Sequence, residues 1–204
     1  MKNKSSKSWI INQHRDQYFK QAKIEGYRSR AAFKLIEINS KFKILKKNTN
    51  LLDLGSYPGG WSQVASKKIL NGKIVSVDMK EMKPISNVKF IKKDFLQEES
   101  QDFIFSYFGE KIDVIISDMA ADTTGNRDLD SIRTNSICLE VLNFSSKILN
   151  SKGILVSKIF MGQDFELVKK EAKKKFNKVN FYKPNSSRTN SKETYIHCQG
   201  LKTL

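Results

Sequence analysis

A short apolar strand, a glycine-rich loop and the start of a helix follow one another in the stretch Leu51-Leu52-Asp53-Leu54-Gly55-Ser56-Tyr57-Pro58-Gly59-Gly60-Trp61. In an open α/β sheet, ligands bind beyond the carboxyl ends of the strands, close to the first loop between a strand and a helix. Glycines in such a loop let the backbone approach a ligand closely. The stretch therefore predicts an α/β domain with a ligand site at this loop.

The glycine spacing differs from the G-x-G-x-x-G pattern of dinucleotide-binding loops. The gap between Gly55 and Gly59 is too wide for that pattern, and Pro58 interrupts it. The loop therefore favours a nucleoside cofactor without a pyrophosphate over NAD.

Strands and helices alternate after this loop, which favours a parallel sheet with helices on both faces. We expect strands over residues 50–54, 73–78, 88–91, 112–117, 153–158, 179–182 and 194–199. We expect helices over residues 59–70, 101–108, 129–149 and 164–175. The last two strands have no helix between them, so one of them should run antiparallel to the rest. The predicted fold is a mostly parallel α/β sheet with one antiparallel strand.

The chain before the sheet is polar and basic. We expect residues 1–13 to be a disordered basic tail, because they are rich in Lys, Ser and Asn. Residues 14–25 are interpreted as a short polar helix, and Ser29 as the N-cap of a helix that runs to about Ser40. Residues 14–204 would then form a single domain whose basic N-terminal helices occupy residues 14–48.

The charge is strongly positive and unevenly distributed. The chain of 204 residues has 37 Lys and Arg against 21 Asp and Glu, a net charge of +16. Residues 1–50 hold 13 basic and 3 acidic residues. Such a field attracts polyanions, which favours nucleic acid as a partner. The alternative is compositional drift, since Lys, Asn, Ile and Ser are all abundant.

Several classes of protein fit the sequence poorly. No apolar run is long enough to cross a membrane, and the polar N-terminus lacks the apolar region of a secretory signal. Cys138 and Cys198 lie in apolar stretches and share no zinc-binding spacing with His14 or His197. We therefore expect a cytoplasmic protein with buried free thiols, without a metal and without a membrane partner.

Acidic residues follow two of the predicted strands. Asp78 ends the second strand, 23 residues after Gly55, and Asp94 follows the third. An acid in the first position can accept the hydroxyls of a ribose, and one in the second can contact an adenine. A lone Asp is more often a loop residue or a helix cap, but the shared position beside the glycine loop favours a cofactor site.

Three more charged residues should meet at the same edge of the sheet. Asp118 and Lys158 each follow an apolar strand, and Glu193 precedes the last strand. Parallel strands end at one edge, and an antiparallel strand begins there. Lys34 lies on the apolar face of the predicted helix that contains it, so it either lines a site or extends its amine to the solvent.

The sequence resembles the FtsJ/RlmE family of ribosomal RNA ribose 2′-O-methyltransferases from about Arg28 to the C-terminus. Six ordered blocks carry the resemblance: residues 29–35 (SRAAFKL), 53–55 with 58–63 (DLG and PGGWSQ), 117–120 (SDMA), 156–158 (VSK), 183–188 (KPNSSR) and 191–195 (SKETY). The resemblance implies a Rossmann-like fold, the cofactor S-adenosylmethionine, and methylation of a uridine in 23S (large-subunit) ribosomal RNA, in the assembled 50S subunit.

The resemblance also implies roles for individual residues. The positions of Lys34, Asp118, Lys158 and Glu193 form the catalytic tetrad of the family. The positions that would hold S-adenosylmethionine are Gly59, Trp61, Asp78, Asp94 and Asp118, and we add Gly55 from the same loop. Two departures from the family pattern, Ala121-Asp122 and Ser56-Tyr57, leave the tetrad intact and bear on the choice of target.

Lys158 has two alternative roles in such a reaction. As the proton acceptor, which is the role we assign to it, the neutral amine would take the proton of the ribose hydroxyl. As an ammonium group, it would instead stabilise the developing oxyanion.

Basic residues near the predicted N-terminal helix are candidate phosphate contacts. They are Arg28, Arg30, Lys41, Lys43, Lys46 and Lys47, with Lys183 and Arg188 expected across the cleft. A charged face without a ligand is the alternative interpretation. Trp61 and Tyr57 are candidates either to stack on the cofactor or a base or to lie in the core, and we favour the core for the ring of Trp61.

Three other functions compete with the methylation of large-subunit RNA. One is a silent RNA-binding assembly factor, which would have no need of a tetrad. The second is a methyltransferase that acts on transfer RNA or another RNA, and the third is a small-molecule methyltransferase, which the net charge disfavours. We expect a monomer.

Overall fold

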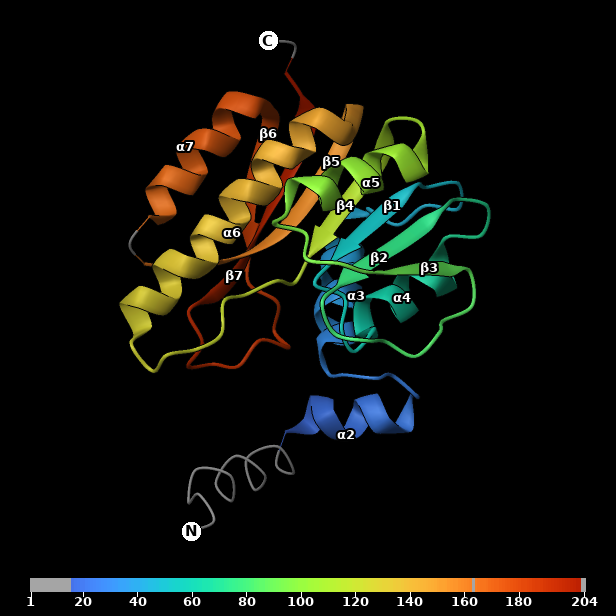
Figure 1. Ribbon diagram of the computed structural model, residues 1–204. Helices are drawn as coiled ribbons and strands as arrows, with labels where there is room; N and C mark the ends of the chain where they lie inside the picture. The colour runs from blue at the N-terminus through green and yellow to red at the C-terminus, as the bar shows by residue number, and fades with distance from the viewer. Residues whose placement is uncertain (1–15, 163, 203–204) are drawn as a thin grey trace.

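Seven strands form one sheet in the order β3-β2-β1-β4-β5-β7-β6 (Figure 1). The computed structural model describes residues 16–162 and 164–202. The strands are β1 (Leu51–Leu54), β2 (Ile74–Asp78), β3 (Val88–Lys92), β4 (Ile112–Ser117), β5 (Leu149–Phe160), β6 (Phe176–Tyr182) and β7 (Glu193–Leu201). Strand β7 pairs antiparallel with both β5 and β6, and the other pairs are parallel. The predicted sheet with one antiparallel strand is confirmed.

Helices cover both faces of the sheet, as predicted (Figure 1). The covering helices are α3 (Ala31–Phe42), α4 (Gly60–Lys68), α5 (Glu98–Phe108), α6 (Arg127–Ile148) and α7 (Phe165–Lys175), whereas α2 (Gln17–Ile24) contacts α3. Successive strand residues point to opposite faces, so each face acquires its own core. One core joins the sheet to α3 and α4, and the other joins it to α5, α6 and α7.

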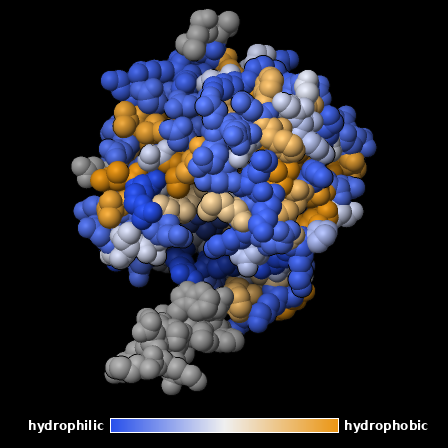
Figure 2. Space-filling view, in the orientation of Figure 1, coloured by the Kyte–Doolittle hydropathy of each residue, from blue (hydrophilic) through white to orange (hydrophobic). Residues whose placement is uncertain are grey.

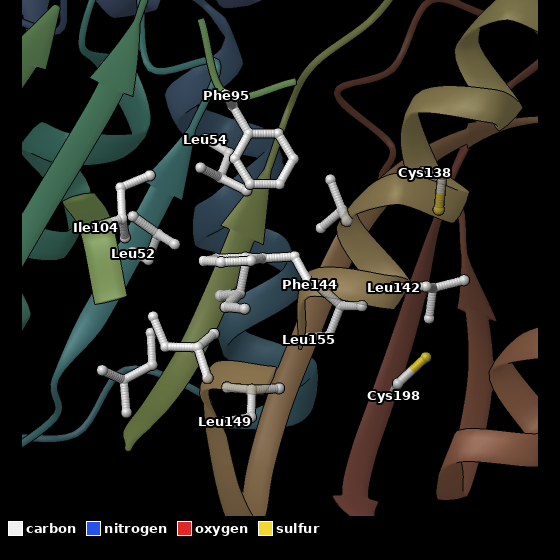
Figure 3. Close-up of a cluster of buried hydrophobic side chains, with 14 of the residues drawn as sticks. Leu52, Leu54, Phe95, Ile104, Cys138, Leu142, Phe144, Leu149, Leu155 and Cys198 are labelled. Atoms are coloured by element: carbon white, nitrogen blue, oxygen red, sulfur yellow. The ribbon is translucent and has the colours of Figure 1, made fainter. Parts of the chain in front are cut away.

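The second core contains both cysteines (Figure 3). Cys138 lies on α6 and Cys198 on β7, among side chains such as Leu142 and Leu155. Both are buried free thiols, as the sequence predicted. Burial raises the pKa of the Cys138 thiol to about 12, so this group stays protonated in its apolar surroundings.

The start of α3 differs from the prediction. The N-cap is Arg30 rather than Ser29, and no side chain caps this end. The Ser29 hydroxyl is buried without a partner in the described part of the chain, and a Cβ at Gly60 would come within 2.4 Å of it. The close packing between the starts of α3 and α4 therefore decides this helix end, and the capping preference of serine does not.

Most other element boundaries differ from the predictions by a few residues. The largest difference is β5, which begins at Leu149 rather than at residue 153, because Leu149 pairs with Ile112 of β4. The first of the described helices, α2, begins at Gln17, where the Asp16 side chain accepts from the amides of Tyr18 and Phe19. The tail predicted over residues 1–13 lies outside the described residues. No helix within the described ranges is long and apolar enough to cross a membrane.

Candidate active site

Four charged side chains meet at the carboxyl edge of the parallel strands. The Lys158 amine lies 2.8 Å from Asp118 Oδ1 and 3.8 Å from Glu193 Oε2. The Lys34 amine lies 2.7 Å from Glu193 Oε1. The four residues predicted as a tetrad are therefore in one connected network of alternating charge.

The topology of the sheet accounts for this meeting. Asp118 directly follows β4, and Lys158 lies near the end of the neighbouring parallel strand β5. Glu193 begins the antiparallel strand β7 and pairs with Phe160 at the end of β5. Lys34 comes from the first turns of α3, which packs behind the sheet. Four segments that are far apart in sequence thus supply one side chain each.

Tyr195 is a fifth member of the network that the sequence reasoning missed. Its hydroxyl donates to Asp118 Oδ1 over 2.6 Å, and its ring packs 5.6 Å from the ring of Trp61. Tyr195 lies two residues after Glu193 on β7, so both side chains project from the same face of the strand. The alternation of side chains along a strand was therefore the signal by which Tyr195 could have been found from the sequence.

The surroundings shift the pKa values of Asp118 and Tyr195 in opposite directions. Burial by itself would raise the pKa of Asp118, but the ammonium groups of Lys158 and Lys34 and two hydrogen bonds outweigh it and hold the pKa below its usual value. Burial, together with the Asp118 and Glu193 carboxylates, raises the pKa of Tyr195 well above its usual value. The network therefore holds an ionised Asp118 against a neutral tyrosine donor.

A cavity of about 370 Å³ opens beside Asp118, at the ends of β1, β2 and β4. Its lining includes Gly55, Asp78, Asp94 and Asp118, which are four of the residues assigned to the cofactor in the sequence analysis. Gly59 and Trp61 do not line it. Trp61 is buried, and its indole donates to the carbonyl of Ala31 over 2.8 Å, which confirms the prediction of a core position for its ring.

The remaining lining of the cavity is mostly apolar, with two lysines and one aspartate. Its other residues are Tyr57, Val77, Met79, Lys80, Lys93, Phe95, Leu96, Met119, Ala120, Asp122 and Ile137. Tyr57 and Asp122, which depart from the family pattern, are thus exposed to whatever occupies this space. Sequence reasoning did not assign the apolar members, which come from β2, from the loops after β1, β2, β3 and β4, and from α6.

Two glycines shape the loop at this cavity. Gly55 has a φ of +72°, and a Cβ there would come within 2.4 Å of the Met119 side chain. Gly59 has a φ of +109° and serves as the N-cap of α4. Side chains at these positions would be strained and would displace their neighbours. The glycines are therefore required for the loop to take this path, whatever it binds.

Asp53 is buried beneath the loop. Its Oδ2 accepts from Ser62 Oγ over 2.6 Å, and Ser62 also shares a hydrogen bond with Ser76. Its Oδ1 is buried without a partner among the described residues. Burial raises the pKa of Asp53 to about 7, against the lowering effect of the Ser62 hydrogen bond, and the nearby Asp118 and Asp78 add to the rise.

A second hollow of about 270 Å³ lies on another side of the tetrad. Its lining consists of Arg30, Lys34, Arg188, Ser191 and Glu193. The loop after β6 closes it, and Glu37 of α3 holds this loop by accepting from the amides of Asn185 and Ser186 over 2.7 and 2.9 Å. The hollow therefore has a fixed wall that carries Arg188.

The candidate phosphate contacts lie in three different settings. Arg28 donates to three backbone carbonyls, so its guanidinium serves the structure. Arg30 binds Asp16 and the Ser186 carbonyl at the rim of the second hollow. Lys46 and Lys47 follow α3 and lie beside the starts of β1 and β5, at the edge opposite to the tetrad. No group of three or more His, Cys, Asp or Glu within the described part of the chain could hold a metal ion.

Residues 27–201 match the model of a family described as FtsJ-like methyltransferase. The chain belongs to this family. It is 47% identical to the Ribosomal RNA large subunit methyltransferase E of Pelagibacter ubique (strain HTCC1062), over 98% of this chain and 99% of the relative. It is 43% identical to the protein of the same name from Rickettsia akari (strain Hartford), over 94% of this chain and 87% of the relative.

Solved structures agree with the fold of this FtsJ-like methyltransferase. A protein of Plasmodium falciparum described as a ribosomal RNA methyltransferase superposes with a TM-score of 0.78 at 35% identity, over 86% of this chain and 98% of the other. Human methyltransferase-like protein 13, solved in complex with SAH, has a TM-score of 0.56 at 17% identity, over 82% and 78% of the two chains. At that identity the second likeness supports the fold alone.

Proposed function

We propose that this methyltransferase transfers the methyl group of S-adenosylmethionine to the 2′-oxygen of a uridine ribose in 23S (large-subunit) ribosomal RNA, in the assembled 50S subunit. One observation carries the proposal: the tetrad stands between two hollows. Asp118 lines the first, while Lys34 and Glu193 line the second. A methyl donor in one hollow and a nucleotide in the other would meet at Lys158. The names of the relatives support large-subunit RNA as the substrate.

The lining of the first hollow fits S-adenosylmethionine. Four Asp and two Lys line it, which suits a cofactor that carries a sulfonium and an ammonium group. Asp78 would accept the ribose hydroxyls, and Asp94 would contact the adenine beside apolar residues such as Leu96 and Ile137. The same acidic lining would repel a pyrophosphate. Gly59 and Trp61 would act by holding the loop at the start of α4.

The chemistry follows from the positions of the tetrad side chains. Bound S-adenosylmethionine supplies a methyl group on a positively charged sulfur. The protein must align the ribose oxygen with that methyl group, and such positioning supplies much of the rate. Lys158 would accept the hydroxyl proton, while Asp118 and Glu193 fix its amine between them. Lys34 would neutralise Glu193 and hold its carboxylate in place.

The other role of Lys158, as a charged group that stabilises the oxyanion, leads to a different pH profile. A proton acceptor gives a rate that rises with pH as the amine loses its proton. Lys158→Arg keeps a positive charge but cannot accept a proton at working pH. An inactive Lys158→Arg variant together with a rising wild-type profile supports the base. A flat profile in single turnovers, with substantial activity of the variant, supports the charged role.

We further propose that a monomer acts in the cytoplasm, where the ribosomal subunit is found, and that residues 14–204 form its single domain. Sedimentation of the purified protein at several concentrations tests the oligomeric state. A mass that doubles with rising concentration would contradict the monomer.

The experiment that tests the function uses methyl-labelled S-adenosylmethionine with three substrates from cells that lack the gene: large ribosomal subunits, free ribosomal RNA and transfer RNA. We expect label on a uridine 2′-oxygen of the subunit, and none with Lys158→Ala. Label on transfer RNA alone would refute the substrate while it keeps the chemistry. Tight cofactor binding without label on any substrate would point to a silent RNA-binding protein.

A further inference from the structure

The edge of the sheet opposite to the tetrad carries a concentration of lysines. One hollow there, of about 490 Å³, is lined by Lys46, Lys47 and Lys152. A second, of about 730 Å³, runs along α7 to this edge and is lined by five lysines of α7 and of the residues after β7, namely Lys169, Lys170, Lys173, Lys174 and Lys202. The acids in the two linings are Asp113 and Glu166. We call these eight lysines the amino-edge lysine strip.

The two hollows are neighbours along this edge. Ser151 belongs to the first hollow, and its carbonyl oxygen lies 3.8 Å from the point where a Cβ of Gly200 would stand. Gly200 precedes Lys202 of the second hollow by two residues. The C-terminal end of α7 lies at the top of Figure 1. Hydrophilic side chains predominate at the same place in Figure 2. The strip therefore forms one extended basic surface.

The acids of this surface are already engaged. Both Asp113 oxygens accept hydrogen bonds of 2.8 Å, from the Asn50 amide and the Asn150 side chain. Glu166 pairs with Lys169 at 3.0 Å. Within residues 16–162 and 164–202, Lys46, Lys47 and Lys152 form no ion pair with a carboxylate. Their positive charges are thus available to a ligand.

Helix stabilisation explains part of the strip but not all of it. Lysines in the last turn of α7 interact favourably with the negative end of the helix dipole. Lys46 and Lys47 lie beyond the end of α3, and Lys152 lies on β5, so the dipole does not account for these three. The backbone around them is fixed: the carbonyl of Lys47 accepts from the amides of Leu70 and Asn71 over 2.9 and 3.0 Å. Their amines therefore project from a rigid base.

We propose that the amino-edge lysine strip binds the phosphodiester backbone of the RNA substrate, as a second anchor remote from the reaction. The inference rests on the proposed function and extends it. Lysine acts on phosphate as a point charge and reads no base, which suits an anchor that positions a folded RNA. A protein partner fits less well, because lysine is depleted in protein–protein interfaces and aromatic anchors are enriched there.

The distance between the tetrad and the amino-edge lysine strip limits which RNAs can contact both. Lys152 and Lys158 lie on the same strand, six residues apart. At about 3.3 Å per residue, Lys152 lies roughly 20 Å from Lys158 of the tetrad. A short single-stranded segment held at the tetrad would not reach the strip, whereas a large folded RNA would. The strip would therefore favour structured RNA over short oligonucleotides.

The test compares binding of two RNAs by three proteins. The probes are an unmodified transcript of large-subunit ribosomal RNA and a short oligouridylate. The proteins are wild type, Lys47→Gln with Lys152→Gln, and the control Lys68→Gln with Lys89→Gln, which also removes two exposed positive charges. We expect the strip variant to bind the transcript on the order of tenfold or more weakly at about 0.1 M salt, with a salt slope shallower by about 2. Arginine at both positions should restore binding.

Three outcomes would overturn the inference. They are a strip variant that binds the transcript no more weakly than the control variant, an equal loss of affinity for oligouridylate, and an unchanged salt slope. Binding is measured without turnover, so these outcomes are independent of the methyl-transfer test. If wild type methylates the subunit but the strip variant binds the transcript normally, the function stands and the strip has no part in it.

Discussion

The two edges of the sheet use the same residue type in opposite ways. At the carboxyl edge, Lys34 and Lys158 are mostly buried and paired with carboxylates within 2.8 Å. At the amino edge, Lys46, Lys47 and Lys152 are exposed and without a carboxylate partner among the described residues. The lysines of the carboxyl edge therefore hold their carboxylate partners in place, whereas those of the amino edge can attract a polyanion from a distance.

This difference has a physical basis in solvation. A buried charge is held by its partner, so removal of one member leaves the other unpaired and costs much more than the pair itself contributes. An exposed charge is screened by water and salt, so its loss changes folding little but changes the attraction of a polyanion. Substitutions at the carboxyl edge should therefore alter activity and stability, and those at the amino edge should alter RNA binding alone.

The largest effect is expected from Lys158→Ala. Loss of a proton acceptor typically lowers a rate by about 10² to 10⁴-fold, and Asp118 would also lose its ion pair. Single-turnover methyl transfer to large subunits measures the loss, with cofactor affinity determined in parallel. Lys89→Ala, at an exposed lysine of β3 that belongs to neither the tetrad nor the strip, is the control. Comparable activity of the two variants would show that Lys158 takes no part in the reaction.

Asp53→Asn should change how stability depends on pH. The pKa of Asp53 is raised from 3.8 to about 7, so the folded protein holds this proton more tightly than the unfolded chain does. Its contribution to stability is complete below about pH 4 and is lost as the pH rises to about 7. The variant has no titrating group at this position. Its free energy of unfolding should therefore rise by a few kcal/mol relative to that of wild type between about pH 4 and 8.

Urea unfolding of both proteins across this range measures the difference, with the exposed Asp102→Asn as control. Parallel pH profiles of wild type and Asp53→Asn would show that the buried carboxyl does not titrate in this window.

Tyr195→Phe should have a smaller effect at the carboxyl edge. The change removes the 2.6 Å hydrogen bond to Asp118 but leaves the Lys158 contact in place. Hydrogen bonds to charged groups contribute about 1.5–3 kcal/mol, so we expect a loss of stability near the lower end and roughly tenfold lower activity. Because the pKa of Tyr195 is well above its usual value, the loss should not vary across neutral pH.

Thermal unfolding and methyl transfer at several pH values measure this effect. Tyr107→Phe, at a tyrosine that is 40% exposed, is the matched control. A loss that disappears on moving to higher pH would contradict the assignment of Tyr195 as a permanent donor.

The smallest effect on stability is expected from Lys47→Gln with Lys152→Gln. Surface substitutions of this kind usually change the free energy of unfolding by less than about 0.5 kcal/mol. Urea unfolding tests this directly. A much larger destabilisation would mean that these lysines support the fold, and their effect on RNA binding would then need the arginine variants to be interpreted.

Sequence patterns predicted the fold well where the pattern is local. Continuous apolar runs such as residues 112–117 identified doubly covered strands, and the missing helix between the last two strands predicted the antiparallel β7. The predictions failed where packing between distant segments decides. The start of α3 depends on α4 at Gly60, and the start of β5 depends on pairing with Ile112.

By itself, the sequence determined the order of strands and helices, the family and the four members of the tetrad, because alternating patterns and short motifs are local properties of the chain. Only the tertiary structure revealed Tyr195 as the donor to Asp118, the buried state of Asp53 and the apolar lining of the cavity beside Asp118. It also separated Lys46 and Lys47 from Lys34, which is close to them in sequence. The physical reason is that burial and contact depend on which segments pack together, and α3 spans the sheet between its two edges.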